Sequence, residues 1–249
     1  MAAPTAQIRP YVEEDRKLAL FMISKANFAG LATANNKTYT HPVTIAIWLA
    51  LSSIFIQYMN WWPSGDFGWI SYLKPFPALA SLAVPVMFAV DWINRPYFEE
   101  LTQEALRYGD LKDIKAYYSK NPASGFWLLE LGDTFVGLIA VDASKPDVKP
   151  RKGEAVQPRT AVIRHFHVEE NYRSSDIQND LLEYAINHAF NKDPTLERIE
   201  IADSPLLSYR RSAARKAGFE LDHNTKVVGV LRWKLGTRYL ERNKWIKST

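Results

Sequence analysis

The sequence of 249 residues contains no cysteine, which excludes disulfide bonds, thiolate metal sites and a thiol nucleophile. The same absence does not decide the redox compartment. Residues 1–7 are uncharged and contain no apolar core, so we expect no secretory signal there. We therefore expect that an apolar segment further along the chain is a permanent part of the protein.

Charge is absent from the stretch Thr38–Gly65, which contains no Asp, Glu, Lys or Arg. Its centre, Val43–Met59, resembles a membrane segment throughout, and a second apolar run, Pro75–Val90, ends at Asp91. A helix that crosses a bilayer needs roughly 20 apolar residues, with about 17 as the lower limit. The first run meets this requirement and the second is marginal.

Aromatic residues flank both apolar runs, as is typical of side chains that prefer the lipid–water boundary. Pro77 and Pro85 would kink the second run and free a backbone carbonyl, which membrane helices tolerate better than soluble ones. The alternative is a pair of buried core helices. We expect a transmembrane helical hairpin over residues 38–93, with spans at about 42–60 and 75–93 and the lipid bilayer as a partner.

Basic residues are concentrated at the end of the chain. Lys234–Thr249 contains five basic residues and one acidic residue, which equals the whole net charge of +4. Residues 236–249 are predicted as a basic tail suited to the anionic face of a membrane, at about 1 kcal/mol per Lys or Arg; a solvated tail is the alternative. No reader motif accompanies these residues, so nucleic acid is not an expected partner. The positive charges outside the hairpin exceed those in its loop, which predicts cytosolic termini and a multi-pass topology.

The rest of the chain has the mixed pattern of an α/β (α+β) domain, here residues 1–37 and 94–235. An exposed loop is expected at 145–158, where prolines and charges cluster. Alternation, helical spacing and turn residues predict the following order. A strand at 7–11 comes first, and a helix follows it to about residue 31. After the apolar hairpin come two helices, at 95–108 and at 110–120, and Asp110 is predicted to cap the second. The remaining elements are a β-hairpin at 124–142, a strand at 160–168, a helix at 175–191, a strand at 197–203, a helix at 206–220 and a final strand at 226–235.

Several stretches carry a more specific signal than this order of elements. They are IRPYVEEDR, RPYFEELTQEALRYGDLKDIKAYY, GFWLLELGDTFVGLIAVD, HFHVEENYRSSDIQNDLLEYAINHA and RKAGFE. Together they resemble the GNAT acetyltransferases, in particular the membrane-anchored camello or cysteine-S-conjugate N-acetyltransferase type, which carries an apolar hairpin after its first helix. The resemblance covers nearly the whole chain. It implies a GNAT-like fold with a mixed central sheet flanked by helices and with acetyl-CoA as cofactor.

In that family, backbone N–H groups in a loop close to R/Q-x-x-G-x-G/A and the following helix N-terminus hold the pyrophosphate of acetyl-CoA. Asp176 stands here where the glycine is expected. A carboxylate about 4–6 Å from each phosphate charge would cost a few kcal/mol at an effective dielectric near 20. We therefore expect acetyl-CoA binding that is weakened or lost, although an ordinary helix N-cap also explains Asp176. The resemblance implies cofactor contacts at Val168, Arg173, Ser174, Ser175, Asp176 and Ile177.

Three residues are candidates for the proton transfers of acetyl transfer. His165 and His167 alternate to one face of their strand and could act as a base; the alternative is a pair of partly buried, hydrogen-bonded histidines. The family often has a tyrosine acid four residues before the last Gly-Phe, where this chain has Ala214. Tyr209 is the candidate substitute, with a packed surface aromatic as the alternative. Two histidines without further ligands do not predict a metal site.

Two functions follow from these expectations. In the first, the chain is a catalytically degenerate GNAT protein of the endoplasmic reticulum membrane that binds a partner or assembles another membrane protein. Two departures, at Asp176 and Ala214, favour this function, and two-span proteins that chaperone a transporter offer an analogy of fold and topology. In the second, the chain is an active N-acetyltransferase that acts on a small amine or a lysine at the membrane surface.

Overall fold

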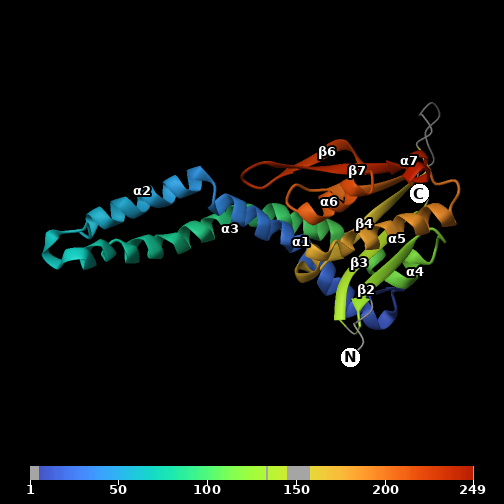
Figure 1. Cartoon of the computed structure of the whole chain (residues 1–249), viewed down its shortest axis with the longest axis horizontal. Coiled ribbons are helices and arrows are strands. Elements are labelled where there is room, and N and C mark those ends of the chain that lie inside the picture. Colours follow the sequence, from blue (N-terminus) through green and yellow to red (C-terminus); the bar gives the residue numbers. More distant parts are fainter. Residues whose placement is uncertain (1–5, 133, 145–157, 249) are drawn as a thin grey trace.

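The computed structural model describes residues 6–132, 134–144 and 158–248. A folded domain carries a long pair of helices that projects from it (Figure 1). The predicted loop at 145–158 lies almost entirely outside the described residues. The first half of the chain forms β1 (Ala6–Pro10), η1 (Glu13–Asp15), α1 (Arg16–Tyr39), α2 (Pro42–Tyr58), η2 (Gly65–Leu73), α3 (Phe76–Arg107), η3 (Gly109–Leu111) and α4 (Ile114–Tyr118). The second half forms β2 (Gly125–Leu131), β3 (Thr134–Asp142), β4 (Thr160–Val168), η4 (Glu170–Ser175), α5 (Ile177–Lys192), β5 (Arg198–Asp203), α6 (Ser208–Lys216), β6 (Glu220–Val228), β7 (Trp233–Glu241) and α7 (Arg242–Ser248).

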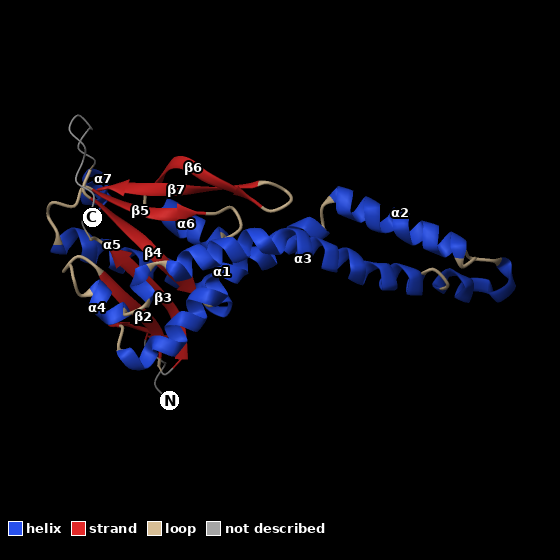
Figure 2. Ribbon diagram, turned by 180° about the vertical axis from the view of Figure 1, so that it is seen from behind, coloured by secondary structure: helices blue, strands red, loops and turns tan. Residues whose placement is uncertain are grey.

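The strands form one seven-stranded sheet in the order β1-β2-β3-β4-β5-β7-β6 (Figure 2). The pair β4–β5 is parallel and the other pairs are antiparallel, so the predicted mixed sheet is confirmed. Pairing between β4 and β5 ends at Ile163 and Ile201, whereas the two strands continue to Val168 and Asp203. The two parallel strands therefore separate toward their carboxyl ends.

Helices cover both faces of the sheet and bury separate apolar clusters. On one face, α5 and α6 pack on the larger cluster, because the apolar residues of α5 recur at helical spacing, as at Leu181, Ala185 and Ala189. On the other face, α1 and α4 cover Leu128, Leu138 and their neighbours. Alternating side chains of β4 thus point toward different helices, which decides which residues reach each side of the sheet.

The projecting pair consists of α2 and the first half of α3 (Figures 1 and 2). The break before α2 has a local cause: Pro42 begins the helix, and His41 before it is extended at φ −70° and ψ 134°. Many large apolar side chains of the pair are exposed, including Val84 at 68%, and so is Trp69 at 74% in η2, which connects the two helices. The helical hairpin predicted over residues 38–93 is therefore present, and its apolar surface does not pack against the domain.

Length and composition single out one helical stretch, residues 68–107, as able to cross a membrane within the described part of the chain. Only 11% of its apolar window is buried. Residues 13–39 and 42–58 meet the same test when they are taken together as one span, but they are bent by 60°. This result describes only the length and composition of the helices.

Several sequence expectations are corrected. The second apolar run and the helix predicted at 95–108 form one continuous helix, α3, which contains both Pro85 and Pro96. The predicted strand 226–235 is divided by a turn between β6 and β7, because Gly229 and Arg232 adopt positive φ values of 72° and 57°. The predicted basic tail is not a tail over its described residues, 236–248: Gly236–Glu241 pair with β5 in the sheet and Arg242–Ser248 form α7.

The cap predicted at Asp110 is also wrong. Asp113 caps α4 instead, since its carboxylate accepts a hydrogen bond from the Ala116 amide at 2.9 Å. Asp110 is fully buried and belongs to a side-chain cluster below the sheet.

Candidate functional site

The opening between β4 and β5 is the place in this fold where functional groups gather. In sheets with parallel strands, ligands bind beyond the carboxyl ends of strands at the point where neighbours diverge. Val168 ends β4 at this point, and the chain then passes through η4 into the N-terminus of α5. The 16-residue α5 directs the unpaired N–H groups of its first turn to the same opening.

Asp176 joins η4 to α5 in a left-handed conformation, with φ 56° and ψ 12°. This is the backbone region that glycine favours and that Asp and Asn enter more readily than other residues. Its side chain makes no cap hydrogen bond to the helix, so Asp176 is not an ordinary N-cap. The loop therefore retains the backbone form that the family's glycine serves, with a carboxylate added.

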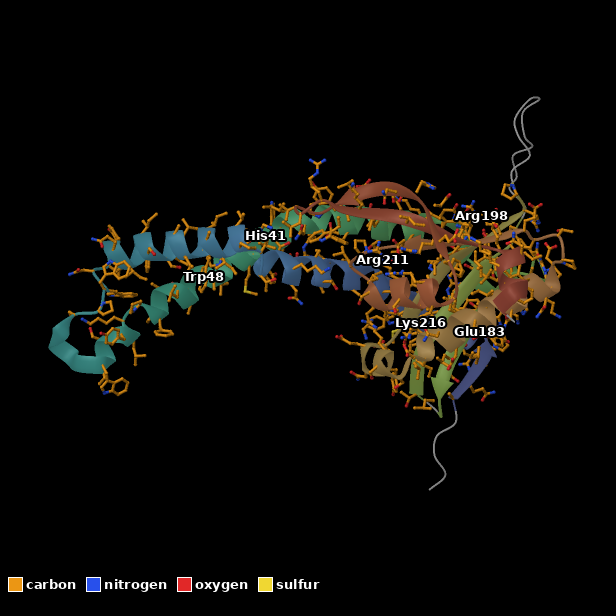
Figure 3. All side chains as sticks on the ribbon, turned by 45° about the horizontal axis from the view of Figure 1, so that its top comes forward. His41, Trp48, Glu183, Arg198, Arg211 and Lys216 are labelled. Atoms are coloured by element: carbon orange, nitrogen blue, oxygen red, sulfur yellow. The ribbon has the colours of Figure 1, made fainter. Side chains whose placement is uncertain are left out.

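Lys216 neutralises this carboxylate. Its ammonium lies 2.9 and 3.0 Å from the two oxygens of Asp176, and the hydrogen bond and charge of Lys216 lower the pKa of Asp176. Lys216 comes from the last turn of α6, next to α5, where Glu183 lies (Figure 3). The charge repulsion expected from the sequence is thus offset by a cation that lies 40 residues away in the chain.

Arg173 spans the opening instead of extending from the loop. Its Nε donates to the Val168 carbonyl at 2.9 Å, and its guanidinium lies 4.1 Å from the centre of the Tyr209 ring. Gln178 holds the loop from below, because its amide donates to the Arg173 carbonyl at 3.1 Å and to Asp176 Oδ1 at 3.2 Å. Ser174 and Ser175 are exposed at the surface of the loop, and Ile177 is half-buried against the main apolar cluster.

His167 is buried beside this loop, with a side chain only 1% exposed. Neither ring nitrogen has a hydrogen-bond partner in the described part of the protein, and Nε2 lies 3.5 Å from Glu169 Oε1. Burial and the positive charge of Arg210 lower the pKa of His167 to about 4, against the opposing effect of Glu169. His167 is therefore neutral at neutral pH.

The carboxylate of Glu169 is ionised and forms an ion pair with Lys25 of α1. Burial opposes ionisation, but the hydrogen bond from Lys25 at 2.8 Å and the neighbouring His167 hold the pKa of Glu169 below its usual value. This pair joins the end of β4 to α1. Glu169 is thus the acidic residue that lies beside His167, with its Oε1 3.5 Å from the Nε2 of the ring.

Tyr209 and Arg210 of α6 complete this side of the opening. The Tyr209 hydroxyl and Arg210 Nε are both buried, and neither has a hydrogen-bond partner among the described residues. Tyr209 is 8% exposed and packs beside Phe166, so it is not a surface aromatic. Ala214 lies in the main apolar cluster, which leaves Tyr209 as the hydroxyl that α6 presents here. Native proteins rarely leave buried polar atoms unpaired unless a ligand or water meets them.

His165 lies on the same face of β4 as His167, since the two pair with Ala140 and Leu138 in the neighbouring strand. Its Nε2 lies 2.8 Å from Asp110 Oδ2, which also accepts a 2.8 Å hydrogen bond from the Tyr118 hydroxyl. A carboxylate only accepts, so Nε2 carries the proton and Nδ1 is the basic nitrogen. The structure therefore separates the two histidines: His165 is held by an acid, and His167 is nearly without a partner.

A cavity of about 250 Å³ adjoins this histidine–carboxylate pair. Asp110 and His165 line it together with Tyr108 and Arg164, and Glu200 closes it from β5. Burial and the hydrogen bond to Asp142 raise the pKa of the neighbouring Tyr117 to about 12. The cavity thus combines an oriented imidazole with two carboxylates and the Arg164 guanidinium, which is paired with Asp142 at 2.6 Å.

Four residues of the site could not be recognised from the sequence. Arg210 lies outside the motif stretches; Lys216 and Glu169 lie within RKAGFE and HFHVEENYRSSDIQNDLLEYAINHA, but nothing in those stretches marked them as site residues. Asp110 carried a signal, but a polar residue before a helix fits a cap equally well. What identifies them is their position next to loop or strand residues distant in sequence.

The model of the Acetyltransferase (GNAT) family matches residues 87–219, more than half of the chain. The chain belongs to this family. The resemblance read from the sequence motifs is confirmed at this level, whereas the membrane-anchored branch is not supported by the comparisons. No curated protein matches the chain significantly.

Solved structures with a similar fold include a GNAT acetyltransferase from Streptococcus pneumoniae, with 11% identity, a TM-score of 0.49 and coverage of 95% of this chain and 99% of that one. A spermidine N-acetyltransferase from Vibrio cholerae, in complex with CoA and spermine, shows 10% identity, a TM-score of 0.46 and coverage of 97% and 98%. A GNAT acetyltransferase from Staphylococcus aureus Mu50 shows 11% identity, a TM-score of 0.45 and coverage of 95% and 99%.

Proposed function

We propose that this chain is a membrane-anchored N-acetyltransferase that binds acetyl-CoA at the opening between β4 and β5 and acetylates an amine near the membrane surface. The observation that carries the proposal is the left-handed backbone of Asp176 at the start of α5, with its carboxylate neutralised by Lys216. The left-handed residue also ends η4 as its C-cap, and it leaves the first turn of α5 with the backbone form that the family's phosphate loop uses.

The residues at the opening fit the cofactor. The N-terminus of α5 and the η4 loop would hold the pyrophosphate through backbone N–H groups, with Lys216 and Arg210 supplying positive charge. The unpaired hydroxyl of Tyr209 and the unpaired ring nitrogens of His167 offer polar contacts in a buried environment. Arg173 would have to leave the Tyr209 ring for the opening to be used, which a flexible side chain can do.

Bound acetyl-CoA supplies an activated acetyl group. The chain's own part is to hold the amine and to take up its proton. His165 is the candidate base, because Asp110 fixes its tautomer and leaves Nδ1 free to accept. Asp110 acts as a positioning residue, and the buried hydroxyl of Tyr209 is the candidate acid.

Membrane anchoring is supported by the helical hairpin. The exposed apolar side chains of α2 and α3 form a larger apolar surface than soluble domains normally expose. Tryptophans at its tip, such as Trp62 and Trp69, are also exposed. Water would make this surface a site of aggregation, whereas a bilayer would cover it. The endoplasmic reticulum as location and cytosolic termini stay predictions.

A second candidate is the assembly function without catalysis, in which the hairpin contacts a membrane-protein partner. Ala214 favours it, since the family's usual acid position has no functional side chain here. The packing of Arg173 across the opening favours it as well. Under this function the chain would not bind acetyl-CoA.

Calorimetric titration of acetyl-CoA into the full chain in mild detergent distinguishes the two. The proposal predicts micromolar binding by the natural chain and several-fold weaker binding by Lys216→Met, because Asp176 is then an unpaired negative charge beside the pyrophosphate. The double variant Asp176→Gly/Lys216→Met should recover affinity, since the repelling carboxylate is gone.

A matched control is Lys226→Met. Lys226 also forms a surface ion pair, at 3.0 Å from Glu100, but on β6. Its substitution should leave acetyl-CoA affinity unchanged. Absence of binding by the natural chain together with binding by Asp176→Gly would contradict the proposal and indicate a disabled cofactor site. Absence of binding by both would support the assembly function.

A further inference from the structure

The turn between β6 and β7, residues 229–232, lies at the foot of the projecting helices, as both views of the fold show (Figures 1 and 2). The Val230 amide donates a hydrogen bond to Asn94 Oδ1 of α3 at 2.9 Å. On either side of the turn, Val228 and Trp233 pack into an apolar cluster that α1 and α3 also line. The turn is therefore held on the two helices that lead into the hairpin.

At the same level on α3, the apolar surface of the hairpin ends. Trp92 and Ile93 are still exposed, at 70% and 49%, whereas Asp91 and Arg95 form an ion pair at 2.6 Å. Asn94 lies three residues after Asp91, which is about 4.5 Å along a helix with a rise of 1.5 Å per residue. Because the proposed anchor places the hairpin in the bilayer, the turn lies at the bilayer surface.

The composition of the turn and its flanks is basic and apolar. Residues 226–235, KVVGVLRWKL, contain three basic residues and no acidic residue. Val227 and Val230 are exposed at 44% and 43%. Arg232 and Lys234 are also exposed, and neither forms an ion pair with a residue that the structure describes. Exposed apolar side chains next to unpaired cations are typical of segments that bind the surface of an anionic bilayer.

The apolar side chains of the turn are directed toward the hairpin. Val230 and Leu231 line the groove between α2 and α3 together with Val90. The turn is also fixed by its backbone, because Gly229 has a φ of 72° and an added Cβ would lie 2.5 Å from the Trp233 ring. The chain thus presents Val230 at a defined position beside the anchor.

We propose that the β6–β7 turn is a second membrane contact, in which Val230 enters the interfacial layer and Arg232 and Lys234 bind the phosphates of anionic phospholipids. The inference rests on the membrane anchor of the proposed function. The position of the turn favours lipid over a protein partner, because the turn lies where the apolar surface of the anchor ends. A hairpin alone leaves the domain free to tilt, whereas two contacts fix its orientation on the bilayer.

Spin labels at single cysteines test this contact, since the natural chain contains no cysteine that would react. The full chain is placed in vesicles of phosphatidylcholine and phosphatidylserine and labelled in the variants Val230→Cys, Val84→Cys and His223→Cys. Val84 reports on the anchor, where it is 68% exposed. His223 is the matched control on β6, six residues before Gly229 and thus about 20 Å from the turn along the strand.

Power saturation compares the collisions of each label with oxygen, which concentrates in lipid, and with a water-soluble nickel chelate. The labels at Val84 and Val230 should collide preferentially with oxygen, and the label at His223 with nickel. Val227→Cys replaces Val230→Cys if that variant fails to fold, because Val227 is exposed near the same turn.

The second arm tests the two cations of the turn. Each basic side chain near an anionic surface raises the affinity for it about five-fold. Arg232→Gln/Lys234→Gln should therefore raise the nickel accessibility of the label at Val230 several-fold, and so should vesicles without phosphatidylserine. The control Lys17→Gln/Lys192→Gln removes the same charge from exposed sites on α1 and α5 and should leave the label in place.

The outcomes separate the inference from the anchor. A label at Val230 as open to nickel as the one at His223, with Val84 in lipid, would overturn the inference alone. Nickel access at Val84 would overturn the anchor and the inference together. A label at Val230 that is shielded from both reagents would indicate a protein partner or a second copy, and would overturn the inference as well. Equal labels in the natural background and in Arg232→Gln/Lys234→Gln would overturn the assignment to these cations.

Discussion

His167 makes the domain sensitive to acid in a defined range of pH. The imidazole is buried, and its pKa is lowered from 6.5 to about 4. Well above pH 6.5 the ring is neutral in both the folded and the unfolded chain, so its titration does not change the stability there. As the pH falls below 6.5, the unfolded chain takes up the proton while the folded chain does not, and stability is lost until the pH reaches about 4.

The size of this loss follows from the two pKa values. At pH 5 the unfolded imidazole is almost fully protonated and the folded one is almost neutral, which lowers the free energy of unfolding by about 2 kcal/mol relative to pH 7.5. Below pH 4 the loss reaches about 3 kcal/mol. Protonation of Glu169, whose pKa is lowered by Lys25 and His167 against the effect of burial, adds a further loss only below its ordinary pKa of 4.5.

Chemical unfolding of the full chain in detergent, followed by tryptophan fluorescence at pH 7.5 and pH 5, measures this loss. His167→Phe removes the titrating ring and should reduce the difference between the two pH values by about 2 kcal/mol. His223→Gln, which removes an exposed imidazole from β6, is the control and should leave the difference in place. An unchanged difference in His167→Phe would refute the assignment of the acid loss to this residue.

Three further outcomes are expected. Tyr118→Phe removes a buried hydrogen bond to Asp110 and should lower the free energy of unfolding by about 1.5–3 kcal/mol in thermal or chemical melts; no loss would show that water replaces the hydroxyl. Asn94→Leu leaves the Val230 amide unpaired at the base of the hairpin and should cost about 1–3 kcal/mol, with faster hydrogen exchange in the β6–β7 turn. Asp110→Asn should shift the pH profile of acetyl transfer through His165 while acetyl-CoA affinity stays the same, and an unshifted profile would remove His165 as the base.

Local patterns were sufficient to predict most of the sheet. The pattern in residues 160–168 predicted β4 with both ends correct, because this strand packs against α5 as well as α1. The β2–β3 hairpin was also predicted, because Gly132 between two apolar runs is a strong turn signal. Such signals lie within a few neighbouring residues, so a single sequence contains them.

The errors arose where packing decides between local alternatives. Pro96 suggests a helix boundary, yet α3 continues through it because α1 packs along the helix. The region after Val228 was interpreted as one strand because it is apolar on both sides of Gly229. Neither the contact with α1 nor the pairing with β5 can be read from local composition.

The candidate site shows the same division. The loop from Arg173 to Ile177 was located by its motif, and its left-handed residue lies at the expected position. The residues that pair with the candidate site were not predicted from the sequence, because Lys216 lies 40 residues from Asp176 and Asp110 lies 55 residues from His165. The sequence therefore overestimated the negative charge that Asp176 brings to the loop, because the cation that neutralises it, Lys216, belongs to α6.

Hydrogen exchange of the full chain in detergent, with and without acetyl-CoA, tests the central claim most directly. The account predicts slower exchange on addition of acetyl-CoA in peptides that cover η4, the first turn of α5 and Tyr209 on α6, with no change in β1 or β2. Unchanged exchange throughout, or protection confined to other elements, would contradict a cofactor site at the opening between β4 and β5.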